Sequence, residues 1–159
     1  MKNEDDTQYI LFVCTGNTCR SAMAEALWNQ AYRSPRAISA GTRAWSGQPA
    51  AAFAQEAVKR YGADLGPHRS RDLDEVIEDP TWVICMTAAQ RDVIAERRPQ
   101  WVDRTRLLTE WVGDSGDIGD PIGWDGEVYV KLASTLHDLI RRAEKNVRSA
   151  HPVENGEDE

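Results

Sequence analysis

The sequence contains no long apolar segment, few cysteines and no stretch of concentrated positive charge. No apolar run approaches the roughly 18 residues that a membrane-spanning helix requires, and the first residues, MKNEDDTQ, are acidic where a secretory signal peptide would be basic. We therefore expect a cytoplasmic protein that does not associate with a membrane. Three cysteines, an odd number, do not predict a disulfide framework, so reduced thiols are the default expectation.

The net charge of −7 is carried mostly by the two ends of the chain. The charged residues of positions 1–7 sum to −2 and those of positions 149–159 sum to −4, which leaves about −1 for the rest. We expect both ends to be disordered acidic tails. Because the chain has no basic stripe, nucleic acid is not expected as a partner.

No internal repeat, low-complexity tract or interior linker divides residues 8–148, so we expect a single domain there. Short apolar runs alternate with segments of helical periodicity, which predicts an α/β domain with a parallel sheet covered on both faces. The expected strands are residues 9–14, 37–41, 81–86 and 104–108. The expected helices are residues 21–32, 50–61 and 126–147, a short one near 72–77, and one that begins after Thr87.

Two helix ends carry specific signals. Gly62 follows the helix expected at residues 50–61 and suits the C′ position, where a left-handed backbone is common. Thr87 is a good N-cap, and Gln90, three residues later, is its expected capping-box partner.

The junction between the first strand and the first helix, VCTGNTCRSA, favours an anion site. Ligands of such sheets gather where strands end and helices begin, and the backbone amides of the loop, with the helix dipole, favour negative charge there. Gly16 and Asn17 tolerate the positive φ that a tight curl needs, and Arg20 can hold two phosphate oxygens. The same field favours a nucleophilic thiolate at Cys14. The alternative is an ordinary strand-to-helix turn with an incidental core cysteine.

A proton donor is needed to expel an alcohol, phenol or guanidine from phosphorus. The glycine-rich segment GDIGDPIGWDG, before the last helix, offers Asp117, Asp120 and Asp125. Asp120 precedes a proline, which favours an extended, stiff backbone, and it is our candidate acid. A solvated loop carboxylate or a helix cap is the alternative for this residue.

Four segments together resemble the low-molecular-weight protein tyrosine phosphatase family. They are FVCTGNTCRSAMAEAL, SAGTRAWSGQP, HRSR and the DP before the last helix, and they occur in the family's order over essentially the whole predicted domain. The resemblance implies a three-layer domain with a four-stranded parallel sheet of flavodoxin-like type.

The resemblance also implies a two-step mechanism without metal or cofactor. Cys14 attacks phosphorus to form a phosphocysteine, Arg20 and the loop amides hold the phosphate oxygens, and Asp120 acts first as acid and then as base. In the family, the residues that match Asn17, Ser21 and Ser39 form hydrogen bonds that hold the loop in shape. Besides the catalytic groups, the expected binding residues are Thr15, Gly16, Asn17, Thr18, Cys19, Ser21 and Trp45.

The residues around the expected pocket bear on the substrate. Tyrosine-directed members of the family usually have an aliphatic residue where this chain has Thr18, which looks like the protein arginine phosphatase branch and suits a polar guanidine. They also commonly have aromatic residues where Ile122 and Gly123 follow the Asp-Pro. Trp45 points the other way, because it matches a tryptophan that often walls the phosphotyrosine pocket, and Trp124 could partly replace the missing aromatics. We expect phosphoarginine in proteins as the substrate, with phosphotyrosine as the alternative.

Cys19 has two readings that the sequence leaves open. The curl of the loop brings its ends together, and the resemblance supports a reversible disulfide between Cys14 and Cys19 that protects against oxidation. Simple packing of Cys19 under the loop is the other. A metal site is not expected, since Cys85 lies in a predicted strand and the three histidines are scattered.

Two further functions share part of the pattern. An arsenate reductase of the thioredoxin-coupled type needs a pair of resolving cysteines downstream, which this chain lacks. A phosphocysteine carrier domain needs neither the loop arginine nor a general acid. We therefore expect an enzyme that acts, as a monomer, on phosphorylated proteins.

Overall fold

The structure is a computed structural model that describes residues 8–150. The predicted acidic tail at residues 1–7 lies outside the described residues, as does the part of the other tail beyond residue 150. The last helix extends to Ala150, so its backbone continues into the segment that we assigned to the second tail. Within the described part of the chain, no helix is both long and apolar enough to span a bilayer.

The sheet has four parallel strands, as predicted, and the structure places them in the order β2-β1-β3-β4. The strands are β1 (Tyr9–Cys14), β2 (Arg36–Gly41), β3 (Trp82–Cys85) and β4 (Thr105–Leu107). The helices are α1 (Arg20–Ala31), α2 (Ala52–Lys59), α3 (Ala88–Arg97), α4 (Leu108–Trp111) and α5 (Gly126–Ala150), with 3-10 helices η2 (Leu73–Glu75) and η3 (Pro99–Arg104). The α/β prediction is therefore confirmed, although α4 and η3 were not expected and the short helix near residue 73 is a 3-10 turn.

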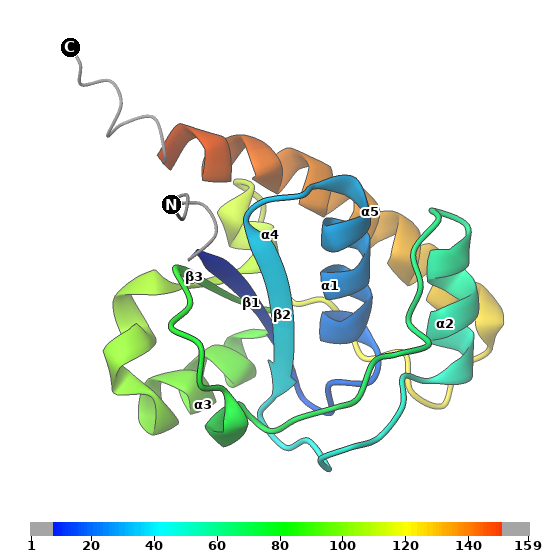
Figure 1. Ribbon diagram of the computed structural model, residues 1–159, viewed down its shortest axis with the longest axis horizontal. Coiled ribbons are helices and arrows are strands. Elements are labelled where there is room, and N and C mark those ends of the chain that lie inside the picture. The colour runs from blue at the N-terminus through cyan, green and yellow to red at the C-terminus, as the bar shows by residue number, and fades with distance from the viewer. Residues whose placement is uncertain (1–7, 151–159) are drawn as a thin grey trace, which may run out of the picture.

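The strand β1 contributes side chains to hydrophobic clusters on both faces of the sheet. Helices α1, α2 and α5 lie on one side of the sheet and α3 on the other (Figure 1). Ile10 and Phe12 are buried in the cluster on the α1 side, whereas Leu11 and Val13 are buried in the cluster on the α3 side. Each fully buried side chain of this size contributes about 1.5–3 kcal/mol, so the central strand is fixed from both sides.

The two predicted helix ends are present. Gly62 has a φ of +81°, and its N–H donates to the carbonyl of Lys59, the last residue of α2. At the start of α3, Thr87 and Gln90 form both hydrogen bonds of the capping box. These signals could be predicted because each depends only on residues within one turn.

The carboxyl ends of the strands meet at one edge of the sheet, where the loop of residues 14–20 lies. The N–H groups of Thr42 and Arg43, just after β2, donate to the carbonyls of Cys14 and Thr15 at 2.9 Å. The N–H of Ala51, before α2, donates to the carbonyl of Thr18 at 3.0 Å. The segment between β2 and α2 therefore holds the 14–20 loop along its length.

Candidate active site

Cys14 ends β1 with its sulfur inside the curl of the 14–20 loop. The Sγ atom lies 2.9 Å from the hydroxyl of Ser21 and accepts the backbone N–H of Asn17 at 3.3 Å. The residue is 2% exposed. The sulfur is thus placed to accept a hydrogen bond from the backbone amide and to share one with the hydroxyl.

Asn17 holds the curl from within. It has a φ of +59° and is fully buried. Its amide nitrogen donates to the hydroxyls of Ser21 at 2.8 Å and Ser39 at 2.9 Å, and its amide oxygen accepts the N–H of Arg71 at 3.0 Å. The structure thus brings together the three residues expected to support the loop, and it adds Arg71.

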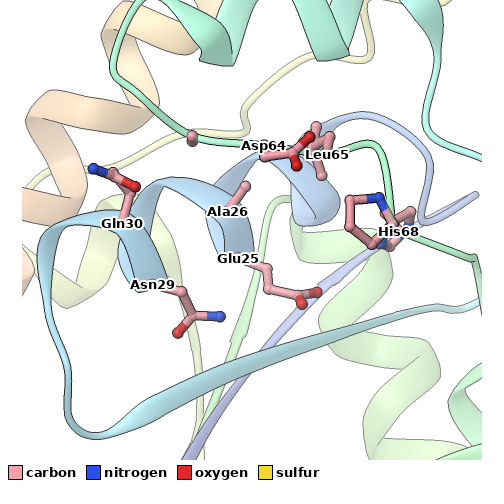
Figure 2. Close-up of a pocket in the computed structure, with 9 residues that line it drawn as sticks. Glu25, Ala26, Asn29, Gln30, Asp64, Leu65 and His68 are labelled. Atoms are coloured by element: carbon pink, nitrogen blue, oxygen red, sulfur yellow. The ribbon is translucent and has the colours of Figure 1, made fainter.

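Glu25 and His68 contact residues that hold the 14–20 loop, and neither was predicted as a site residue. The hydroxyl of Ser39 donates to Glu25 at 2.5 Å, and His68 Nε2 lies 2.7 Å from the carbonyl oxygen of Asn17. Because a carbonyl only accepts, Nε2 carries the proton. Glu25 projects from α1 and His68 from the segment after α2, and both line a cavity of about 340 Å³ (Figure 2). His68 lies in the HRSR stretch, but its contact with Asn17 carries no signal in the sequence.

Arg20 begins α1 and is 4% exposed. One guanidinium nitrogen donates to the carbonyl of Ile118 at 2.8 Å, and another lies 3.5 Å from the carboxylate of Asp120. Its Nε atom is buried and has no acceptor among the described residues. A buried donor without a partner is rare, so this guanidinium keeps a hydrogen bond available for an anion.

The three aspartates of the segment before α5 have different environments. Asp117 accepts the N–H of Ala88, and Asp125 accepts the N–H groups of Glu127 and Val128 at the start of α5. The Asp120 side chain is 43% exposed, contacts Arg20 and accepts the N–H of its neighbour Ile122 at 3.1 Å. Of the three, the structure brings Asp120 to the 14–20 loop.

The residues expected to select the substrate differ in their exposure. Thr18 is partly buried, and its hydroxyl is 3.9 Å from the sulfur of Cys19. Trp45, in the segment after β2, is 81% exposed, and Ile122 and Trp124 are also exposed. The indole of Trp45 is therefore open to solvent. Thr15 and Gly16 are partly buried within the curl.

Cys19 is buried beneath the loop, with its sulfur 3.6 Å from the hydroxyl of Tyr129. Burial raises the pKa of the Cys19 thiol, and the hydrogen bond with Tyr129 offsets only part of this rise. Burial also raises the pKa of Tyr129, with the Cys19 contact adding to it. Both groups therefore stay protonated near neutral pH. Cys14, Cys19 and Cys85 are free thiols, and a disulfide between the first two stays a prediction.

Two residues that sequence reasoning did not place near the loop contact Thr15. A Cβ atom on Gly41, the last residue of β2, would lie 2.4 Å from the carbonyl oxygen of Thr15 and 3.1 Å from the nitrogen of Asn17. On the other side, Gln90 Nε2 donates to the hydroxyl of Thr15 at 3.1 Å. Within residues 8–150, no cluster of three or more His, Cys, Asp or Glu side chains could hold a metal ion.

Comparisons with known proteins match this arrangement over nearly the whole chain. The family model of the low molecular weight phosphotyrosine protein phosphatases matches residues 9–151. A protein-arginine-phosphatase of Geobacillus stearothermophilus is 44% identical over 140 residues, which are 86% of this chain and 94% of that protein. A probable low molecular weight protein-tyrosine-phosphatase, EpsP, of Ralstonia solanacearum is 38% identical, over 87% and 90% of the two chains.

Solved structures show the same fold. The YwlE arginine phosphatase of Geobacillus stearothermophilus superposes with a TM-score of 0.84 at 40% identity, over 92% of this chain and 96% of that chain. A low molecular weight protein tyrosine phosphatase of T. tengcongensis superposes with a TM-score of 0.83 at 36% identity, over 87% and 99%. The chain therefore belongs to the low molecular weight phosphotyrosine protein phosphatase family.

Proposed function

We propose that this protein phosphatase removes phosphate from arginine side chains of proteins through a phosphocysteine at Cys14. The observation that carries the proposal is that Asp120, from a distant part of the chain, contacts Arg20 in the curled loop that also holds Cys14. The arrangement supplies a nucleophile, an anion clamp and an acid, which together suffice for transfer of a phosphoryl group.

In the first step, the Cys14 thiolate attacks phosphorus, so that a P–S bond forms and the P–N bond breaks. Arg20 and the N–H groups of the loop bind the three equatorial oxygens, where negative charge is spread in the transition state. Asp120 in its carboxylic acid form gives its proton to the guanidine nitrogen, which takes the electron pair of the broken bond. The protein substrate leaves with an unmodified arginine side chain, and Asp120 is left as a carboxylate.

In the second step, a water molecule attacks the phosphocysteine. The Asp120 carboxylate takes a proton from this water, an oxygen–phosphorus bond forms, and the Cys14 thiolate leaves. Inorganic phosphate is released, and both residues return to their starting forms. Asn17, Ser21 and Ser39 hold the loop in the shape that both steps need, which their mutual hydrogen bonds support.

Three features support arginine as the dephosphorylated residue. Thr18 offers a hydroxyl at a position where a bulkier side chain would favour an aromatic ring. Ile122 and Gly123 stand where tyrosine-directed members of the family commonly have aromatic residues. A relative that is 44% identical is a protein-arginine-phosphatase. Phosphotyrosine is the second candidate, favoured by the exposed ring of Trp45 and by relatives that are tyrosine phosphatases. A thiolate nucleophile also suits the reducing cytoplasm, where we expect the protein to act as a monomer.

The test compares phosphoarginine and phosphotyrosine peptides of identical flanking sequence, with the unmodified chain and with Thr18→Ile. We expect the higher kcat/KM on phosphoarginine, and a shift of about tenfold or more toward phosphotyrosine in Thr18→Ile. Asp120→Ala should slow turnover by about 100-fold or more and leave inhibition by inorganic phosphate unchanged. A preference of the unmodified chain for phosphotyrosine contradicts the arginine assignment, and unimpaired turnover by Asp120→Ala removes Asp120 from its role.

A further inference from the structure

Gln90 lies in the first turn of α3, and every polar atom of its buried carboxamide is engaged. Its Oε1 atom accepts the N–H groups of Met86 at 2.8 Å and Thr87 at 3.0 Å. Its Nε2 atom donates to the hydroxyl of Thr15, the residue that follows the nucleophile. The residue is 3% exposed. One side chain thus binds the backbone of the β3–α3 turn and, across the site, the 14–20 loop.

The β3–α3 turn also contacts the 116–125 loop, which contains the candidate acid, Asp120. The N–H of Ile118 donates to the carbonyl of Met86 at 2.9 Å, and the carboxylate of Asp117 accepts the N–H of Ala88 at 2.9 Å. Both contacts lie within three residues of Asp120. Residues 86–88 therefore hold the 116–125 loop through two hydrogen bonds, to Ile118 and to Asp117.

We propose that Gln90 is a positioning residue that ties the 14–20 loop to the 116–125 loop and so keeps Asp120 within reach of the leaving group. The inference rests on the proposed function, because it assumes that Asp120 is the general acid. Gln90 itself takes no part in the chemistry. A capping box needs the Gln90 backbone and side chain only at the helix start. The hydrogen bond to Thr15 goes beyond capping, since it joins α3 to a loop 75 positions away in the sequence.

The consequence differs between substrates. A leaving group that is a strong base depends on the proton from Asp120, whereas the anion of an acidic phenol departs without it. An acid displaced by a fraction of an ångström to about 1 Å loses much of its contribution. Loosening the link should therefore slow substrates with poor leaving groups and spare those with good ones.

The test measures kcat/KM, which reports formation of the phosphocysteine, for a series of aryl phosphates from dinitrophenyl phosphate to phenyl phosphate. Gln90→Met keeps the side-chain volume and removes its hydrogen bonds, and Thr15→Val removes the acceptor while leaving the capping box intact. We expect both variants to lose about tenfold on phenyl phosphate and less than about twofold on dinitrophenyl phosphate. Arg91→Gln, an exposed change on the next residue of α3, is the matched control and should leave both values unchanged.

A double-mutant cycle separates positioning from a general loss of structure. If Gln90 acts through Asp120, Gln90→Met should have less than about a twofold effect on phenyl phosphate when Asp120→Ala is already present. Equal losses across the phosphate series, a loss that multiplies with that of Asp120→Ala, or weaker inhibition by inorganic phosphate in Gln90→Met would overturn the inference. If the unmodified chain hydrolyses neither aryl phosphates nor phosphoarginine, it is the proposed function that fails.

Discussion

Gly41, the last residue of β2, lies directly against the backbone of the 14–20 loop. Its missing side chain leaves room for the carbonyl of Thr15 and the nitrogen of Asn17, both backbone atoms that cannot move without moving the loop. The geometry of the amides around the phosphate thus depends on a residue of the neighbouring strand that touches no substrate.

We expect Gly41→Ala to lower kcat/KM by about 100-fold, because a displacement of the loop by about 1 Å misaligns Cys14 and the phosphate-binding amides together. Steady-state kinetics with an aryl phosphate, and inhibition by inorganic phosphate, measure the effect. Gly66→Ala is a suitable control, because the atom nearest to its added Cβ belongs to the flexible Asp64 side chain. Normal activity in Gly41→Ala would mean that the loop adapts to the added methyl group.

Some residues of the site could be predicted from the sequence, and others could not. Cys14, Asn17 and Arg20 could be proposed from the sequence because they lie in one short loop between an apolar strand and a helix. Gln90 and His68 could not, because their contacts with the loop arise only when segments more than 50 positions apart pack together. Asp120 could be chosen among the three aspartates before α5 from the proline that follows it and from the family resemblance, and its contact with Arg20 agrees with that choice.

Among the secondary structure elements, α2 ends in a left-handed residue that only glycine adopts without strain. Gly62 has a φ of +81°, and Gly62→Ala should lower the free energy of unfolding by about 1–2 kcal/mol. Gly62→Asn should cost less, because asparagine tolerates this conformation better. Urea denaturation of the three proteins measures both differences. An alanine variant as stable as the unmodified chain would show that this turn readily adopts another conformation.

The regular elements were predictable to different degrees. β1 and α5 have apolar patterns long enough to be recognised, and their starts agree with the structure. The helix α4 has only four residues. The 3-10 helix η3 is stabilised by Trp101, which is buried in the hydrophobic cluster on the α3 side of the sheet. Such short segments have no periodicity of their own, so tertiary contacts determine them.

For the molecule as a whole, buried thiol and phenol groups make the free energy of unfolding fall as the pH rises through the alkaline range. Burial raises the pKa of the Cys85 thiol to about 12 from an ordinary 9.0. Between these values the folded chain keeps the proton and the unfolded chain releases it, so the unfolded state binds fewer protons and stability falls as pH rises. The loss from this one thiol is at most about 1.4 kcal/mol per pH unit within the window.

Cys85→Ala should flatten this decline. The free energy of unfolding, measured in urea at about pH 8, 9.5 and 11, should fall less steeply in the variant, whatever the fixed cost of the smaller side chain. Cys19 and Tyr129, whose pKa values burial also raises, give a remaining slope of the same sign. Identical slopes in the two proteins would contradict the buried, protonated state of Cys85.

The central place of β1 ties catalysis to global folding. Cys14 is the last residue of the strand that both hydrophobic clusters share, so fraying of an edge strand or of the chain ends leaves the nucleophile in place. Regions with most of the buried contacts open only when the whole domain opens, and the amide hydrogens of β1 should be among the last to exchange with solvent. Heat inactivation of this protein would then follow cooperative melting of the entire domain, and destabilising changes in the sheet away from the 14–20 loop would appear as loss of active enzyme rather than as altered kinetics.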